Sequence, residues 1–163
     1  ARQLSKAMLH SVALLLTAVL VAGIAPEFRW AQRKDKIFLT FDIQSATEPK
    51  FVIEDDGHFA IQAKGYSHDE REQAETYELD LTFLKPVNSS DSNCTVGARD
   101  IQCTIMKKVR APYWKRLLQT KTKLPTMTID WSKWLDEEKD GVRWNDQADR
   151  PWEWWKHQDE EEE

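Results

Sequence analysis

The chain has 163 residues, of which 40% are hydrophobic and 31% charged, and this length predicts one globular domain with appendages. The formal net charge is −5, but residues 101–129 hold seven bases and no acid, whereas residues 136–163 hold twelve acids and four bases. Because the acidic end would compete with phosphate for the basic stretch, we expect no nucleic-acid binding.

Near its start the chain has an apolar block, residues 11–25, that contains no charge. Two basic residues, Arg2 and Lys6, precede it. A basic start, an apolar middle and a small-residue end are typical of a signal peptide, and the block is shorter than the roughly 20 residues of a membrane span. We therefore assign residues 1–25 to a signal peptide or membrane-targeting segment, with a mature chain that begins between Ile24 and Pro26. An uncleaved anchor and a buried apolar helix are the alternatives. After cleavage we expect no stable membrane insertion.

Short stretches with apolar side chains at every second position come next. "KIFLTFDIQ" (36–44) and "ETYELDLTFL" (75–84) each place four apolar residues on one face, and "DG" (56–57) is a hairpin signal. Turn clusters such as "KPVNSSDSN" (85–93) separate the stretches. This punctuation predicts an all-β fold, a compact antiparallel β-sandwich of seven to eight strands.

The segment "NCTVGARDIQCTI" (93–105) predicts a hairpin with Ala98 and Arg99 at its tip. In that register Cys94 faces Cys103 across a non-hydrogen-bonded pair, with Cα atoms about 4.5 Å apart. We expect a Cys94–Cys103 disulfide in an oxidising compartment. Two reduced core cysteines are the alternative, as in a cytosolic protein.

Two later segments, "YWKRLLQT" (113–120) and "DWSKWLDEE" (130–138), predict one or two helical turns each, with Asp130 as the N-cap of the second. Pro112 and Pro125 bracket the first segment. There we expect Trp114 and Leu117 to pack against the sandwich and the bases to face outward.

Four segments carry a resemblance to a known family. They are "WAQR" (30–33), "VGARDIQCTIMKK" (96–108), "YWKRLLQTKTKLP" (113–125) and "IDWSKWLDEE" (129–138). Together they resemble the CS domain of the 23-kDa co-chaperones, which is similar in fold to small heat-shock proteins and also occurs at the N-terminus of a membrane-bound acyl-CoA dehydratase-like protein. The resemblance covers residues 28–138 and leaves residues 139–163 as an acidic, tryptophan-rich tail. It implies a partner, a 90-kDa heat-shock-type chaperone in its closed, nucleotide-bound form, together with that chaperone's clients.

The residues offer no catalytic constellation. The four histidines, His10, His58, His68 and His157, lie in four different contexts, and no His/Cys cluster has zinc spacing. The glycines are scattered and form no phosphate loop. We therefore predict a non-enzymatic, monomeric protein without catalytic residues, metal or cofactor.

The predicted partner-binding residues lie in the matched segments. Trp131 and Trp134 are three apart and would share one side of a helical turn; we favour burial for Trp131 and leave Trp134 open between core and interface. The full predicted set is Arg33, Lys115, Arg116, Lys121, Lys123, Trp131 and Trp134.

We expect three tryptophans of the tail to dock, because they would otherwise expose a large apolar area to solvent. They are Trp152, Trp154 and Trp155. The sandwich itself, a groove of a partner and a membrane interface are the alternatives, and the acidic charge disfavours the last. Asn88 in "NSS" and Asn93 in "NCT", both in or near a loop, are the expected glycosylation acceptors of a lumenal protein.

Two functions remain open. The first is a co-chaperone of the endoplasmic reticulum lumen or a secreted one, or a cytoplasmic one if the N-terminal segment is no signal. The second is a structural scaffold module that docks into a larger assembly through the CS surface and the tail.

Overall fold

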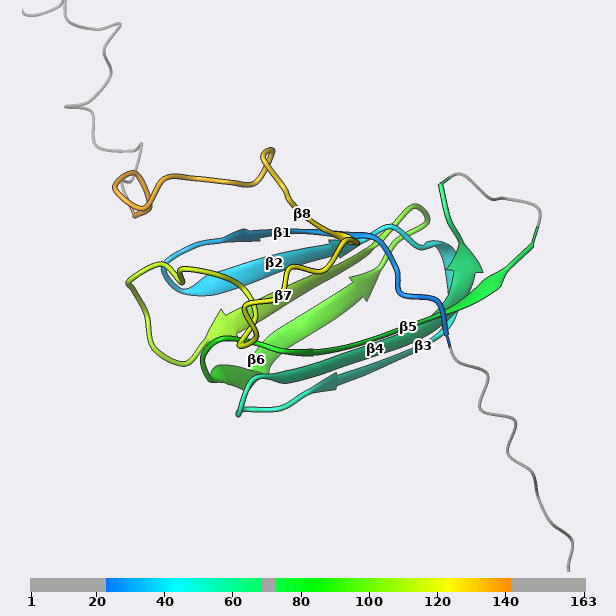
Figure 1. Cartoon of the computed structure of the whole chain (residues 1–163), viewed down its shortest axis with the longest axis horizontal. Coiled ribbons are helices and arrows are strands. Elements are labelled where there is room, and N and C mark those ends of the chain that lie inside the picture. The colour runs from blue at the N-terminus through cyan, green and yellow to red at the C-terminus, as the bar shows by residue number, and fades with distance from the viewer. Residues whose placement is uncertain (1–22, 69–72, 142–163) are drawn as a thin grey trace, which may run out of the picture.

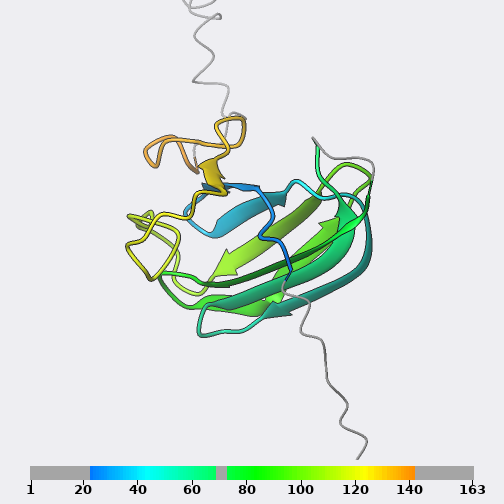
Figure 2. The same cartoon turned by 45° about the vertical axis from the view of Figure 1, so that its right-hand side comes forward.

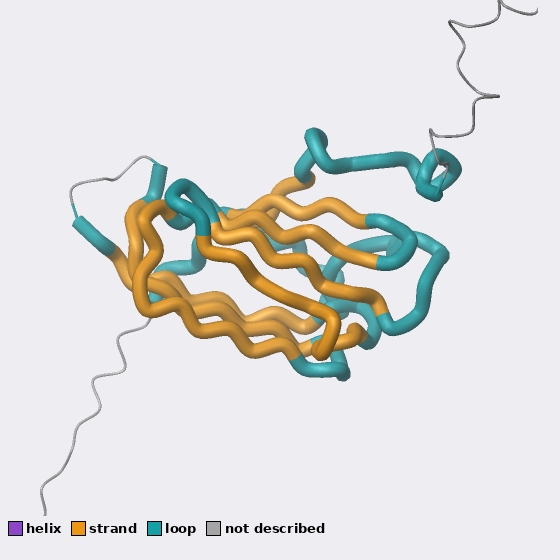
Figure 3. Tube along the Cα trace, turned by 180° about the vertical axis from the view of Figure 1, so that it is seen from behind, coloured by secondary structure: helices purple, strands orange, loops and turns teal. Residues whose placement is uncertain are grey.

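The computed structural model describes residues 23–68 and 73–141, and these form eight β-strands joined by loops (Figures 1 and 3). The strands are β1 (Phe28–Gln32), β2 (Lys36–Phe41), β3 (Gln44–Ile53), β4 (His58–Tyr66), β5 (Glu75–Thr82), β6 (Val87–Val96), β7 (Ile101–Lys107) and β8 (Met127–Ile129). In this part of the chain there is no helix that could cross a membrane. Most of the expected signal peptide and the tail residues Trp152, Trp154 and Trp155 lie outside the described residues.

The strands form two sheets that stack face to face (Figures 1 and 2). One sheet has five strands in the order β6-β7-β2-β1-β8, and the other has three in the order β3-β4-β5. The pairs are antiparallel, except that β8 runs parallel to β1. At the predicted "DG" turn between β3 and β4, Gly57 has a φ of 102°, a conformation that glycine adopts readily. The predicted antiparallel β-sandwich is confirmed.

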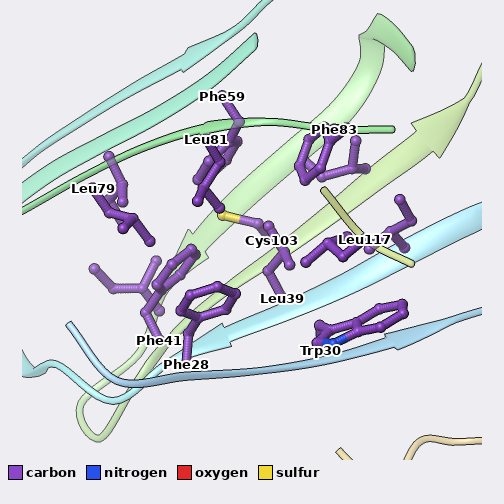
Figure 4. Packing of buried hydrophobic residues seen from close by; sticks show 14 of the residues in the cluster. Phe28, Trp30, Leu39, Phe41, Phe59, Leu79, Leu81, Phe83, Cys103 and Leu117 are labelled. Atoms are coloured by element: carbon purple, nitrogen blue, oxygen red, sulfur yellow. The ribbon is translucent and has the colours of Figure 1, made fainter. Parts of the chain in front are cut away.

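The core lies between the two sheets, because each sheet turns its alternate apolar residues toward the other. Figure 4 shows Phe28, Trp30, Leu39 and Phe41 of the five-stranded sheet opposite Phe59, Leu79, Leu81 and Phe83. Each of these eight side chains is at most 8% exposed. The rings of Phe41 and Phe59 stack across the interface with centroids 5.8 Å apart. The predicted inward faces of residues 36–44 and 75–84 are therefore confirmed.

The β6–β7 hairpin has the predicted register, with Cys94 opposite Cys103 and Val96 opposite Ile101. The Gly97 amide donates to the Asp100 carbonyl at 2.8 Å and closes the turn. The Cα atoms of the two cysteines lie 4.0 Å apart and their sulfurs are bonded. Cys103 is buried and Cys94 half-buried, so the bond joins the core to the edge of the sheet.

The polar segment 85–93 was expected to be a turn cluster, and this is wrong: most of it belongs to β6, which pairs with β7 across a bulge. Both glycosylation candidates, Asn88 and Asn93, therefore lie in a strand. The Ser92 hydroxyl makes this possible, because it donates to the Asn88 carbonyl at 2.6 Å and accepts the Met106 amide at 2.8 Å. A serine side chain thus takes a place in the ladder at the bulge.

The helical turns expected over residues 113–120 and 130–138 are also wrong, since both segments are extended loops and turns. Tertiary partners use the backbone groups that a helix would need. The Leu117 carbonyl accepts the Leu84 amide at 2.9 Å, and the Leu135 carbonyl accepts the Tyr113 hydroxyl at 3.0 Å. Asp130 still caps a turn, because its carboxylate accepts the Ser132 amide at 3.2 Å.

Candidate partner-binding groove

A groove of about 450 Å³ lies between the β8 edge of the five-stranded sheet and the loop of residues 115–123. Three segments that are far apart in the chain form its apolar floor. The floor residues are Trp30, Leu117, Leu118, Met127 and Ile129. The short strand β8 lies here because it pairs with β1, with Ile129 opposite Trp30.

The loop of residues 115–123 is anchored by its own apolar residues. Trp114, Leu117 and Leu118 are at most 5% exposed, and Leu118 forms a β-bridge with Phe83 beyond the end of β5. With these side chains facing inward, Lys115 and the polar residues 119–123 that follow Leu118 are exposed. The positive charge of this segment therefore lies on the surface, as expected.

Four basic side chains line the rim of the groove: Lys115, Arg116, Lys121 and Lys123. The three lysines are exposed. Arg116 is half-buried because its guanidinium donates to the carbonyls of Leu118 and Gln119, at 3.0 Å each. Among the described residues, none of the four cations forms an ion pair. The groove therefore combines an apolar floor with a positive rim that has no ion-pair partner in the part of the chain that the structure describes.

Trp131 lines the same groove and is 73% exposed, so the burial favoured for it is wrong. Trp134 takes the position against the sheet instead, with its ring centroid 5.8 Å from that of Trp30. The ring of Trp131 lies outside it, at 6.1 Å. These three tryptophans form a row that leads from the core to the surface (Trp30–Trp134–Trp131), and its outer end lies at the groove.

Arg33 lies in the connection between β1 and β2 and does not line the groove. Its guanidinium donates to the carbonyls of Gln32, at 3.0 Å, and of Lys133, and lies 5.5 Å from the ring centroid of Phe38. Arg33 therefore holds the segment after β8 against the sheet. The structure thus brings five of the seven predicted residues to one groove, with Trp134 behind it and Arg33 supporting it.

A buried polar cluster fixes the start of the loop, and the residue pattern did not predict it. The Gln32 side-chain oxygen accepts the Trp114 amide at 2.8 Å and the Lys107 ammonium at 2.9 Å, and its amide donates to the Trp114 carbonyl at 3.0 Å. Lys107 is 7% exposed and lies 5.2 Å from the Tyr113 ring centroid. Burial lowers the pKa of Lys107 to about 8. The sequence does contain one signal for this cluster. Gln32 is a polar residue at a position where the alternation along β1 predicts an apolar, inward-facing side chain.

A charged cluster lies away from the groove, where the β3–β4 turn meets β5. The His58 imidazole contacts Glu54 and Asp80, each at 2.9 Å. The hydrogen bonds to Asp80 and then to Glu54 raise the pKa of His58. These contacts connect the β3–β4 turn to β5 at the solvent-exposed surface.

The glycosylation candidates lie on the edge of the five-stranded sheet opposite to the groove, because β6 and β8 are its two outer strands. The Asn88 side-chain amide donates to Asp91 at 2.7 Å and its oxygen accepts the Ser90 hydroxyl at 2.7 Å. Asn93 is exposed. A glycan on either residue would leave the groove open.

Comparison with protein-family models shows that the model described as "CS domain" matches residues 26–107. These residues include β1 to β7, so the match covers both sheets except for β8. The groove is therefore built where this matched region meets the loop and strand that follow it.

Curated relatives match a longer stretch. An uncharacterized protein from Oryza sativa subsp. indica is 36% identical over 118 residues, which are 72% of this chain and 53% of that protein. "Co-chaperone protein p23-1" from Brassica napus is 31% identical over 114 residues, or 69% of this chain and 61% of that protein. A "Very-long-chain (3R)-3-hydroxyacyl-CoA dehydratase" from Danio rerio is 29% identical over 117 residues, or 72% of this chain and 31% of that protein. The chain thus spans about half the length of the first of these relatives.

Proposed function

The chain belongs to the CS domain family, and we propose that it acts as a non-enzymatic co-chaperone of a 90-kDa heat-shock-type chaperone. In this proposal it binds the closed, nucleotide-bound form of that chaperone and assists the folding of its clients. A relative that is itself called a co-chaperone supports a chaperone-associated role. The dehydratase relative shares less than a third of its own length with this chain and supports no enzymatic role here.

The observation that carries the proposal is the groove with its positive rim. Exposed aromatic side chains such as Trp131 dominate the binding energy of interfaces, and rim charges accelerate encounter with a surface of opposite charge. Lys115, Lys121 and Lys123 are exposed and unpaired among the described residues, so they are available to acidic groups of a partner. The site therefore fits a partner surface that carries carboxylates around an apolar patch.

We place the protein in the secretory pathway, in the endoplasmic reticulum lumen or outside the cell. The apolar segment of residues 11–25 supports this proposal, as does the Cys94–Cys103 bond, because disulfides persist in oxidising compartments. The partner would then be the chaperone paralogue of that compartment.

A nucleotide-dependent binding measurement tests the function. The full chain is expected to bind the purified chaperone more tightly with a non-hydrolysable nucleotide than with the diphosphate. Lys115→Glu combined with Lys121→Glu should weaken that binding about tenfold at low salt, because two rim charges are reversed. Arg116 is left unchanged, since it holds two carbonyls of the loop.

The matched control is Lys50→Glu combined with Lys64→Glu, which reverses two exposed charges on β3 and β4. This variant should bind as the unsubstituted protein does. Equal loss of binding in both variants would show a general charge effect and would assign the wrong surface. Binding that is indifferent to the nucleotide would favour the scaffold module over the co-chaperone.

A further inference from the structure

The groove has features that select one kind of ligand. Its floor is apolar, its wall includes the exposed ring of Trp131, and its rim carries four positive charges. A peptide that places aromatic rings next to carboxylates would satisfy both parts, because the rings bury apolar area and the carboxylates pair with the lysines. A purely apolar peptide would leave the rim unpaired.

The chain carries such a peptide itself. Residues 151–163, "PWEWWKHQDEEEE", contain three tryptophans and six acids against one lysine. The rings of Trp154 and Trp155 are followed, three residues further on, by the acidic run of residues 159–163. This segment therefore has the charge opposite to that of the rim and the aromatic content that the floor accepts.

The tail also starts close to the groove. Asp140, near the end of the described residues, contacts the Tyr113 hydroxyl at 3.2 Å. The Tyr113 ring lies 6.2 Å from Trp134, and Trp134 lies 6.1 Å from Trp131 at the groove. One hydrogen bond and two ring contacts thus separate the start of the tail from its proposed site. The eleven residue steps between Gly141 and Trp152 span up to about 36 Å when extended, which is ample for this path.

We propose that residues 151–163 dock into the groove of the same molecule and act as an intramolecular competitor of the partner. The competition rests on the proposed function, whereas the docking rests on the groove alone. A tethered segment acts at an effective concentration of order millimolar, so a weak contact is enough to occupy the site. The partner must then displace the tail, and its apparent affinity falls by the fraction of molecules that are open.

Carbodiimide crosslinking of the full chain tests the docking, because this reagent joins a carboxylate directly to a contacting amine. Carboxylates of residues 159–163 should form amides with Lys115, Lys121 and Lys123, identified by mass spectrometry. The control amines are Lys50 and Lys64, which are also exposed, on β3 and β4; Lys64 pairs with Glu48 at 3.1 Å, so Lys50 is the closer match. Trp154→Ala with Trp155→Ala should reduce the groove crosslinks, and Trp144→Ala should not.

A mixture of isotopically light and heavy protein shows whether each crosslink lies within one molecule. Crosslinks to Lys50 and Lys64 as frequent as those to the rim lysines would overturn the docking. Crosslinks that join light to heavy chains would assign the groove to the tail of a second copy and overturn the intramolecular arrangement.

The competition is tested separately with the chaperone. If the tail occupies the groove in four-fifths of the molecules, Trp154→Ala with Trp155→Ala should strengthen chaperone binding about fivefold. Weaker binding in this variant would mean that the tail contributes to the complex, and would overturn the competition. The crosslinking needs no chaperone, so failure of the proposed function and failure of the docking give different results.

Discussion

Gln32 shows how much a single residue can decide in this fold. It follows Phe28 and Trp30 on the inward side of β1, where an apolar residue would be expected, and is 2% exposed. Its amide group bonds both backbone groups of Trp114, 82 residues away. The loop that carries the rim cations is therefore positioned by a buried amide, and Lys107 completes the cluster. A buried polar group persists only where such partners are satisfied.

Lys107 should make the stability of the domain depend on pH. Its folded pKa of about 8 lies below its ordinary value of 10.5, so between these values the unfolded chain binds more protons. The free energy of unfolding should therefore rise with pH through this window. Lys107→Met should remove this rise, and Lys50→Met, at an exposed position, should retain it.

Urea unfolding at about pH 7.5 and about pH 9.5 measures this change in the free energy of unfolding. The two pH values lie on either side of the folded pKa of about 8 and below the ordinary value of 10.5. Tyr113 contributes little there, because its ordinary pKa of 10.0 and its folded pKa of about 12, which burial and then Asp140 raise, both lie above these pH values. An unfolding free energy of Lys107→Met that rises with pH as steeply as that of the unsubstituted chain would contradict the assignment to Lys107.

At the level of elements, strands with a clear alternation were predicted correctly and segments without one were not. Residues 113–120 have a composition compatible with helix, yet their backbone pairs with the end of β5 and with the residues after it. Helix propensities differ by less than about 1 kcal/mol per residue, whereas burying a side chain such as Trp114 contributes more. Tertiary contact therefore overrides local preference in this segment.

The β6–β7 hairpin should lose stability when its disulfide is removed. Cys94→Ser with Cys103→Ser should lower the free energy of unfolding by about 2 kcal/mol, because the bond closes a short loop and short loops gain least. Reduction of the unsubstituted protein should lower it by a similar amount, measured by denaturant unfolding with and without reductant. The double variant should not respond to the reductant. Labelling of both thiols in native, unreduced protein would contradict the bond.

On the scale of the whole molecule, the candidate site depends on segments that only the folded chain brings together. Trp30 and Trp131 are about a hundred residues apart and line one groove. The β6 edge, with both asparagines, lies at the other side of the same sheet. The N-terminal end of the described chain reaches the second sheet, where the Ile24 amide donates to the Thr76 carbonyl at 2.8 Å.

The compartment can be tested on the intact protein expressed with residues 1–25 in secretory cells. A mature N-terminus between Ile24 and Pro26 is expected, because small residues follow the apolar block. Treatment with a glycosidase should also increase the electrophoretic mobility of the protein. Asn93→Gln should reduce this mobility shift more than Asn88→Gln does, since the Asn88 amide is already bonded to Asp91. A peptide that spans residues 20–30 uncut in the mature protein would contradict cleavage.

The sequence by itself determined the sandwich, the inward faces of its strands and the pairing of Cys94 with Cys103. These follow from a period of two and from a tight turn, which are properties of neighbouring residues. It also identified the basic segment that becomes the rim. The tertiary structure alone decided that Lys107 is buried, that Trp131 is exposed while Trp134 takes its place, and that loop, β1 and β8 enclose one groove. Those outcomes depend on which surfaces meet in space, and contacts between residues about a hundred positions apart leave no local pattern.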